Sequence, residues 1–272
     1  MMKIEEVILE SGLARSFIFK TCSERSESKS LEYQPGQFIM LWIPRLDEKP
    51  FSISYHGKDF FGVTVALKGR FTQRLHEMKV GEWAGIRGPF GRAFNLGAGR
   101  ACPEPIRSRA CVVGGGVGMA SLAVLIERLE NSVVVQGART ASELLYRNRL
   151  KDMLLCTEDG SAGTNGVPTD LLEDLYRHYR FDAIYTCGPE AMMVRVLEFA
   201  REYNIYMQAS LERYIKCAVG VCGQCCCNGL RLCVEGPVLD GGTLEKLEDF
   251  GRYARLGNGC RVPIGTYLGK KT

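Results

Sequence analysis

Histidine is scarce in this sequence of 272 residues: only His56, His76 and His178 occur, widely separated along the chain. None stands near a plausible nucleophile, so we assign none of them a catalytic role. The formal net charge is only +4, and the basic residues are spread along the chain rather than clustered. This charge distribution does not favour nucleic acid as a partner, because nucleic-acid binding depends on a concentrated basic surface.

Long hydrophobic runs are also lacking. The longest apolar stretch, around Cys111–Ile126, is broken by four glycines and is shorter than the roughly 20 residues of a membrane-spanning helix. The N-terminal residues Met1–Glu6 contain no apolar segment of the kind found in signal peptides. We therefore expect a cytoplasmic protein without a membrane partner, in which thiols stay reduced and can hold metal.

The length predicts about two domains with a small appendage. Between Lys3 and Phe94, short β-type runs such as Phe38–Ile43 and Gly62–Leu67 are separated by turn residues. Regular spacing of this kind predicts an antiparallel β-barrel, interrupted by one helix near Arg70–His76. We assign residues 1–100 to this barrel domain.

From about Arg109 to Tyr203 the pattern changes to alternating strands and helices, which predicts a parallel sheet covered by helices. Gly97–Arg107, rich in glycine and proline, is the expected linker. We assign residues 101–208 to this α/β domain and residues 209–272 to a small C-terminal domain. The expected strands are 110–113, 133–136, 154–156 and 183–186, and the expected helices are 119–130, 141–150, 168–178 and 190–202.

Six of the twelve cysteines fall between positions 217 and 233. Four of them follow the spacing C-x4-C-x2-C with one more cysteine downstream: Cys217, Cys222, Cys225 and Cys233. This loop pattern holds a [2Fe–2S] cluster in plant-type ferredoxins. Glycines in the loop allow the thiolates to converge while backbone N–H groups face the sulfides. The window therefore predicts a centre that carries single electrons between two redox partners.

Other occupants of this cysteine window remain open. Zinc sites usually show two separated C-x2-C pairs, and a second pair is lacking here. A zinc-loaded loop would make the chain a binding module for which a nucleotide is a sensor ligand. Disulfides or buried free thiols are a further alternative. Cys226 and Cys227 lie next to Cys225 and could compete as ligands, but we expect them to pack beneath the cluster.

Two glycine-containing turns suggest a dinucleotide site. Residues 114–118 follow one buried-type strand and open a helix, where unpaired N–H groups favour a pyrophosphate. Residues 187–189 follow another such strand, at the sheet edge where open α/β sheets bind ligands. A turn without a ligand and a simple helix start are the structural alternatives. The candidate nucleotide-binding residues are Gly114, Gly115, Gly116, Cys187, Gly188 and Pro189.

The order of these features makes a resemblance explicit. A barrel with Lys49–Ser52, an α/β domain with a glycine-rich turn and C-G-P, and a terminal cysteine loop resemble the ferredoxin–NADP reductase superfamily. Within it, the chain is most similar to the electron-transfer subunit of type 1B dihydroorotate dehydrogenase. That match depends on the cysteine loop, on Ser210–Arg213 before it and on Cys233–Val238 after it. The resemblance covers almost the whole chain.

The resemblance implies that the barrel binds FAD. Residues 49–52 look like the family's R-P-x-S, with Ser52 near the reactive edge of the isoalloxazine ring. Lys49 stands where arginine is usual, which keeps the charge but loses the bidentate fork. Residues 66–68 resemble the segment beside the ribityl and phosphate groups, and residues 71–72 the pyrophosphate-binding G-T. The implied flavin-binding residues are Lys49, Pro50, Phe51, Ser52, Ala66, Leu67, Lys68, Phe71 and Thr72.

The resemblance also implies a function. A partner subunit with FMN would oxidise dihydroorotate to orotate in pyrimidine synthesis and reduce the [2Fe–2S] cluster, from which electrons would pass to FAD and then to NAD⁺. FAD is needed because the cluster transfers one electron at a time and NAD⁺ accepts two. Two copies of each subunit are the family expectation. Arg139 leaves the choice between NAD and NADP open, and the resemblance favours NAD.

A related alternative is a diaphorase-like subunit of a sulfide dehydrogenase, a ferredoxin-dependent transhydrogenase or a cytoplasmic hydrogenase. Such subunits share the barrel, the nucleotide domain and the cysteine loop, so sequence motifs separate them poorly. A genomic neighbour that encodes an FMN-binding barrel subunit would favour dihydroorotate, and a hydrogenase gene would oppose it.

Overall fold

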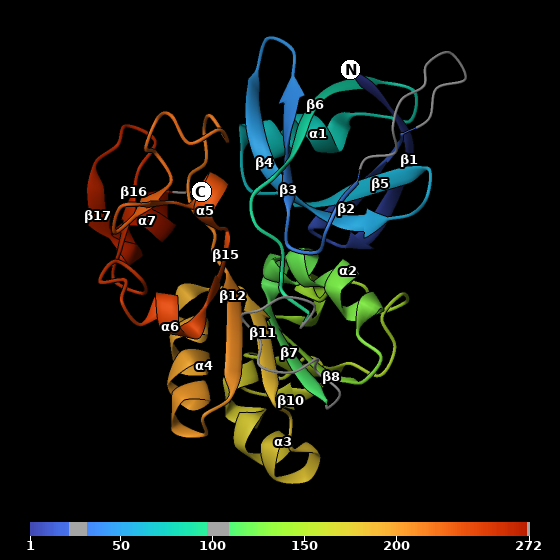
Figure 1. Cartoon of the computed structure of the whole chain (residues 1–272). Coiled ribbons are helices and arrows are strands. Elements are labelled where there is room, and N and C mark those ends of the chain that lie inside the picture. The colour runs from blue at the N-terminus through green and yellow to red at the C-terminus, as the bar shows by residue number, and fades with distance from the viewer. Residues whose placement is uncertain (22–31, 97–108, 271–272) are drawn as a thin grey trace.

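The computed structural model describes residues 1–21, 32–96 and 109–270. A β-barrel stands above an α/β unit, and the C-terminal part of the chain lies along one side of both (Figure 1). The predicted combination of an antiparallel barrel and a parallel α/β sheet is confirmed.

Six strands close the barrel in the order β1-β2-β5-β4-β3-β6, and neighbouring strands are antiparallel. Large apolar side chains such as Phe17 and Phe61 fill the interior, and the helix α1 adds Phe71 and Leu75 to the same core. The elements are β1 Met2–Ser11, β2 Ala14–Lys20, β3 Phe38–Ile43, β4 Asp47–His56, β5 Phe60–Ala66, α1 Arg70–Glu77 and β6 Trp83–Phe90.

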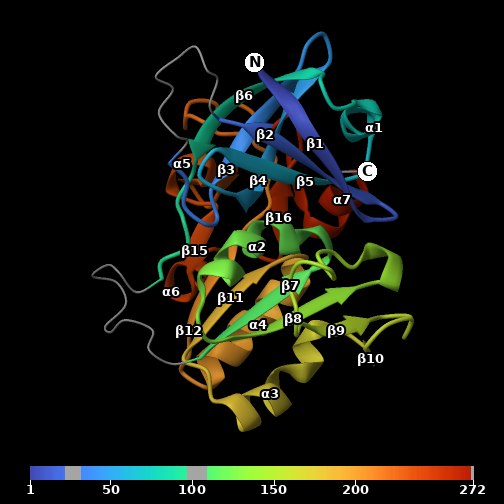
Figure 2. The ribbon, with the colours of Figure 1, turned by 90° about the vertical axis from the view of Figure 1, so that its right-hand side faces the viewer.

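The second sheet has the strand order β10-β9-β8-β7-β11-β12-β15. All neighbours are parallel except β12 and β15. Its central strand β7 is buried along its whole length, because α2 covers the face toward the barrel while α3 and α4 cover the other (Figure 2). The elements are β7 Ala110–Gly115, η1 Gly116–Gly118, α2 Met119–Arg128, β8 Ser132–Ala138, η2 Ala141–Glu143, β9 Leu154–Thr157, β10 Thr164–Asn165, η3 Pro168–Leu171, α3 Leu172–Tyr179, β11 Ala183–Cys187, α4 Glu190–Glu202 and β12 Tyr206–Ser210.

The C-terminal segment is joined to both units. Its strand β15 extends the sheet, Pro237 forms a bridge with Arg92, and its apolar core is continuous with Phe38 of the barrel. The elements are β13 Cys226–Cys227, β14 Leu230–Arg231, α5 Leu232–Glu235, β15 Val238–Asp240, α6 Gly241–Leu244, β16 Tyr253–Arg255, β17 Arg261–Pro263 and α7 Ile264–Lys270.

The predicted helix over 141–150 is wrong. Only the short 3₁₀ turn η2 forms there, and Tyr146 adopts a left-handed backbone conformation at φ 58°. The Tyr146 hydroxyl donates to Thr64 Oγ1 at 2.5 Å, and Arg149 Nη1 donates to the Ser54 carbonyl at 2.8 Å. Contacts with the barrel thus override the helix propensity of this segment.

Other predicted elements differ only at their ends. The helix expected over 119–130 ends at Arg128, and the one expected over 168–178 begins with the 3₁₀ turn η3 before α3 continues to Tyr179. The expected linker, 97–107, lies outside the described residues. In the ranges that the structure describes, no helix combines the length and apolar character needed to cross a membrane.

Candidate functional site

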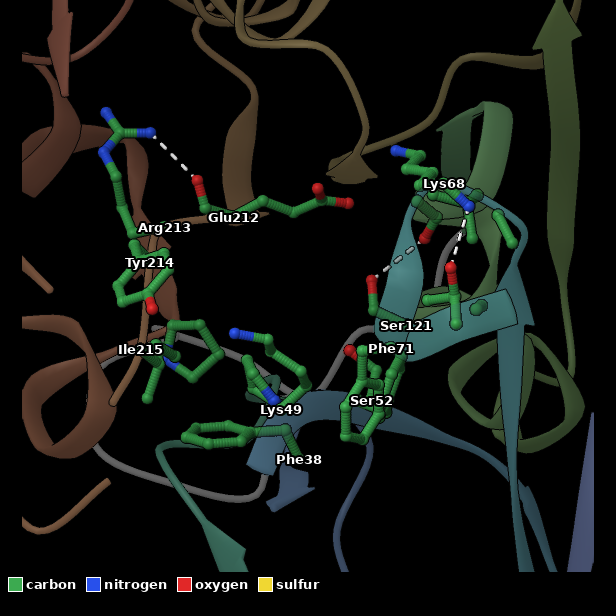
Figure 3. Close-up of a pocket in the computed structure, with 18 of the residues that line it drawn as sticks. Phe38, Lys49, Ser52, Lys68, Phe71, Ser121, Glu212, Arg213, Tyr214 and Ile215 are labelled. Carbon is green, nitrogen blue, oxygen red and sulfur yellow. Dashed lines mark hydrogen bonds between the residues drawn. The ribbon is translucent and has the colours of Figure 1, made fainter. Parts of the chain in front are cut away.

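A cavity of about 630 Å³ lies where the barrel, the start of α2 and the C-terminal segment meet. Lys49 and Ser52 of β4 lie on the barrel side, while Glu212, Tyr214 and Ile215 follow β12 on another side (Figure 3). Its walls are mainly apolar, with a few charged side chains. That combination suits a planar ring system with a charged arm.

Most of the predicted flavin-binding residues line this cavity. Leu67 is the exception: it is not among the lining residues, and its side chain is 44% exposed. The predicted residues that do line the cavity are Lys49, Pro50, Phe51, Ser52, Ala66, Lys68, Phe71 and Thr72.

The expected phosphate-binding end is built around the first turn of α1. The Thr72 hydroxyl accepts from the N–H groups of Lys68 and Gly69, both at 2.9 Å, and donates to the Gly69 carbonyl at 2.9 Å. This hydroxyl therefore holds the turn in shape. Like the first N–H groups of any helix, those of Arg70 and Phe71 have no acceptor within the helix. With the lining cations Lys68 and Arg70, this turn fits a pyrophosphate.

Lys49 lies at another edge of the cavity. Its ammonium group pairs with Asp47 at 2.5 Å and stands over the Tyr214 ring, 5.3 Å from the ring centre. Lys49, one of the implied flavin-binding residues, is thus partnered by a carboxylate and by an aromatic ring of the C-terminal segment.

The two glycine-containing turns touch each other at the carboxyl ends of β7 and β11. A Cβ atom on Gly118 would lie 2.6 Å from the Cys187 carbonyl, and one on Gly188 would lie 2.9 Å from the Gly115 backbone. Of the predicted nucleotide-binding residues, Cys187 lines the cavity and the others do not: Gly114, Gly115, Gly116, Gly188 and Pro189. Gly118 of the same turn lines it as well. Pro189 is the N-cap of α4 rather than its first helical residue.

Several lining residues were missed by the sequence reasoning. Ser121 donates to the Gly118 carbonyl at 3.0 Å at the start of α2, and Thr64 reaches the cavity from β5. Glu212 and Arg213 belong to the family pattern given above, whereas Tyr214 and Ile215 were not predicted. No signal in the sequence assigned them to this wall, because they enter it from a segment far along the chain.

A buried ion pair supports that wall. Arg213 and Glu190 are 2% and 7% exposed, and Arg213 Nη2 donates to Glu190 Oε2 at 3.0 Å. The same carboxylate oxygen accepts from the Gly251 N–H at 2.7 Å, and Arg213 also donates to the Tyr253 carbonyl at 3.4 Å. The pair therefore ties the segment after β12 to the first turn of α4 and to β16.

The four predicted cluster cysteines form two neighbouring pairs. The Cys217 thiol interacts with that of Cys222, and the Cys233 thiol with that of Cys225. The Cys233 N–H also donates to Cys225 Sγ at 3.4 Å. Within the described ranges, no three His, Cys, Asp or Glu side chains gather as a site for a single ion would require. Two pairs of thiolates are what a di-iron centre requires, since each iron takes two.

Backbone N–H groups favour the thiolate form of Cys217. Burial opposes ionisation of Cys217, but N–H groups of Cys222, Val219 and Val221 lower its pKa to about 6. Burial and the neighbouring Cys225 thiol raise the pKa of Cys233 to about 12, although a hydrogen bond from the Gly220 backbone acts to lower it. The Cys233 thiol therefore holds its proton more strongly than a free cysteine does, and a bound metal would displace that proton. The donor set fits a [2Fe–2S] cluster.

The extra cysteines occupy different surroundings. Cys227 is fully buried, and burial raises the pKa of its thiol although Arg213 acts in the opposite direction. Cys226 is partly buried on the two-residue strand β13, and burial raises its pKa too. Cys226 also interacts electrostatically with Cys225.

Comparison with known proteins agrees with this site. The family model described as the iron–sulfur cluster binding domain of dihydroorotate dehydrogenase B matches residues 212–245, which contain both cysteine pairs. A relative from Methanocaldococcus jannaschii, named a probable dihydroorotate dehydrogenase B (NAD(+)), electron transfer subunit, is 39% identical over 96% of each chain. One of the same name from Methanothermobacter thermautotrophicus is 40% identical over 97% of each.

This chain belongs to the dihydroorotate dehydrogenase B electron transfer subunit family. That membership includes the cysteine loop as well as the barrel and the sheet, because the alignments run through nearly the full length of both chains. It also confirms the family resemblance on which the flavin expectations were based.

Solved structures place the family's fold among flavin reductases. An NADH-dependent reduced ferredoxin–NADP oxidoreductase, studied for flavin-based electron bifurcation, superposes with a TM-score of 0.76 at 27% identity, over 89% of this chain and 88% of that one. The FAD/NAD-binding domain of a Vibrio cholerae nitric oxide dioxygenase has a TM-score of 0.56 at 16% identity, over 75% of this chain and 93% of that one. The second likeness shows the fold alone.

Proposed function

We propose that this chain is an electron-transfer subunit that receives electrons from a dehydrogenase subunit carrying FMN, which oxidises dihydroorotate during pyrimidine biosynthesis. Electrons would enter at a [2Fe–2S] cluster, pass through FAD and leave on NAD⁺. The complex would hold two copies of each subunit. We propose a cytoplasmic location, because metal-binding thiols persist where the compartment keeps them reduced.

One observation carries this proposal: a single continuous segment contributes to both the flavin-type cavity and the cysteine pairs. Ile215 lines the cavity, and Cys217 follows two residues later. Arg87 of the barrel strand β6 donates to the Cys217 carbonyl at 3.5 Å, which ties the loop to the barrel. Two cofactors held this way would be neighbours, as electron transfer between them requires.

The residue assignments are part of the proposal. The cysteines Cys217, Cys222, Cys225 and Cys233 would hold the cluster, and FAD would supply the conversion between single-electron and two-electron transfer. The lining residues of β4, β5 and α1 would bind the flavin. The turns at 114–116 and 187–189 would face NAD. Arg139 pairs with Glu143 at 2.6 Å, and a carboxylate in that position disfavours an additional 2′-phosphate.

The cofactor content tests the proposal directly. Protein purified without oxygen should contain about two irons, two labile sulfides and one FAD per chain. NADH should bleach the flavin absorption and then the iron–sulfur absorption. A colourless protein with bound zinc would instead favour the nucleotide-sensing alternative.

A single substitution tests the ligand assignment. We expect Cys222→Ser to abolish the iron signal, because one iron loses a thiolate, while FAD binding and NADH-dependent dye reduction largely persist. Cys260→Ser is the matched control, since Cys260 is an exposed free cysteine outside the loop. Unchanged iron content in Cys222→Ser would contradict the assignment.

The diaphorase-like alternative has one specific observation in its favour, the 27% identity with the NADH-dependent oxidoreductase. The 39% and 40% identities with the subunits named for dihydroorotate dehydrogenase B favour the first proposal. Co-purification of an FMN-containing subunit that oxidises dihydroorotate would separate the two.

A further inference from the structure

A charged side chain of the barrel contacts the cysteine loop. Arg87 lies on β6, and its Nη2 donates to the Cys217 carbonyl at 3.5 Å. The guanidinium also interacts electrostatically with the Cys217 side chain. Arg87 does not line the flavin-type cavity, so it has no part in the flavin-binding assignments. Its contact with the first of the four candidate ligands therefore needs an explanation of its own.

A bidentate ion pair fixes the direction of this guanidinium. Arg87 Nε and Nη2 donate to the two carboxylate oxygens of Glu48 on β4, at 2.8 and 2.7 Å. The same guanidinium stands over the Phe90 ring, 5.5 Å from its centre. A planar fork held at two points cannot turn freely, so Nη2 stays directed at the loop. An exposed ion pair adds little to stability, so the stability of the barrel alone does not explain this arrangement.

Two other cations beside the loop are paired within the rest of the chain. Arg231 donates to a loop carbonyl at 3.3 Å and pairs with Glu235 at 3.2 Å. Arg213 belongs to the buried ion pair described above. A substitution at Arg87 or Glu48 leaves both of these pairs in place. It therefore changes the charge beside the loop from the barrel side only.

A charge at this position acts directly on the transferred electron. If the proposed function holds, the four thiolates bind a cluster that gains one negative charge when it accepts an electron. A fixed cation nearby stabilises the more negative state, and a fixed anion destabilises it. The potentials of such clusters depend on the charge around them. Arg87 should thus favour the reduced cluster, and Glu48 the oxidised one.

We propose that Arg87 and Glu48 together set the reduction potential of the cluster from the barrel side. Arg87 contacts the loop and raises the potential, and Glu48 limits this effect because it pairs with the same charge. The inference rests on the proposed function, since it requires a cluster at the four cysteines. The barrel that contributes to the flavin-type cavity would then also control how strongly the neighbouring site holds an electron.

The test compares midpoint potentials. Full-length holoprotein is reduced stepwise without oxygen in the presence of mediator dyes, and the iron–sulfur absorption is followed against the solution potential. In Arg87→Met the ratio of reduced to oxidised cluster at a given potential should fall about threefold to tenfold, and in Glu48→Gln it should rise by a similar factor. A tenfold change in this one-electron equilibrium corresponds to a shift of about 59 mV.

Further variants separate charge from structure. Arg87→Lys keeps the charge but loses the fork, so its midpoint should stay close to that of the wild type. The double variant Arg87→Met/Glu48→Gln removes both charges, so its midpoint should return toward the wild-type value. Arg177→Met removes a cation from α3, at the opposite end of the molecule from β6 (Figure 1), and should change nothing. High salt should reduce the shifts of the two single variants, because exposed charges are screened.

Each outcome supports or overturns a specific claim. If wild-type protein prepared without oxygen holds no iron–sulfur cluster, the proposed function itself fails. If the cluster is present and Arg87→Met and Glu48→Gln keep the wild-type midpoint, or shift it in the same direction, the tuning role is overturned. A shift in Arg87→Lys as large as that in Arg87→Met would overturn it too. Opposite shifts that cancel in the double variant support it.

Discussion

Single residues decide how closely the two glycine-containing turns approach. Gly118 and Cys187 belong to different strand–helix connections, yet their backbones are in contact. The glycines of the first turn therefore have a packing role, whatever ligand lies beside them. A methyl group in this contact would meet backbone atoms, which cannot swing away as a side chain can.

Gly118→Ala should lower the free energy of unfolding by about 1–3 kcal/mol through overpacking and should weaken NADH binding, because the turns must separate. Gly12→Ala is the control: a Cβ there meets nothing within 4 Å, and the expected change is within about 0.5 kcal/mol. Urea unfolding and NADH titration measure both effects. Equal unfolding midpoints for the two variants would contradict this packing role.

The candidate cluster ligands are also a matter of single residues. The spacing of Cys217, Cys222, Cys225 and Cys233 predicts four thiols in one loop. Their arrangement as two pairs could not be derived from spacing, because it depends on how the loop turns at Gly220 and Gly223, both at positive φ. Ala218 also adopts a positive φ of 62° in this loop.

Among the elements, α4 and the segment after β12 depend on one buried ion pair. If Arg213 were replaced, the Glu190 carboxylate would lose its cation. The Glu190 side chain is only 7% exposed, so water could not solvate the remaining charge. The same carboxylate also accepts a hydrogen bond from the Gly251 N–H. The pair therefore stabilises the wall between the cavity and the cysteine loop.

Arg213→Met should cost about 3–5 kcal/mol of stability, because it leaves a buried charge unpaired. Adding Glu190→Gln should recover part of that loss, since the remaining group is neutral. Arg177→Met, which breaks the exposed pair with Glu173, should cost only about 0–1 kcal/mol. Denaturant unfolding compares the three, and equal losses in the two single variants would refute the assignment.

Elements were largely predictable where hydrophobic periodicity was strong. The helix over 190–202 and the buried strands of the sheet followed from local pattern. The segment 141–150 did not, because Tyr146 and Arg149 form their hydrogen bonds with the barrel. A local sequence pattern contains no information about hydrogen-bond partners far away in the chain. Tyr146, for example, bonds to Thr64, which lies 82 positions earlier.

The whole molecule is less modular than three consecutive domains would suggest. We still propose 209–272 as the cluster-binding unit, but β15 supplies a strand to the sheet and Ile215, Leu256 and Tyr267 line the cavity. The flavin-type cavity is therefore complete only when the C-terminal segment is folded against both other parts (Figures 1 and 3).

A chain that ends at Ser210 should lose cooperative thermal unfolding and retain little FAD, because β12 loses its partner β15 and the core shared with Phe38 is exposed. A chain that ends at Leu268 keeps these contacts and should unfold like the full-length protein. Circular dichroism and bound-flavin absorption provide the measurements. A stable truncated protein with stoichiometric FAD would show that the first two units are self-sufficient.

Sequence alone determined the type of most barrel and sheet elements, the order of barrel and sheet, and the cysteine ligand candidates, because periodicity and spacing act over short distances. Tertiary structure alone decided that Glu212 to Ile215 join the barrel strands around one cavity, that Arg87 contacts the Cys217 carbonyl, and that Arg213 meets Glu190. Those contacts join segments far apart in the chain. Their energies depend on burial and on the distances between the interacting groups, and both are set only when the chain has folded.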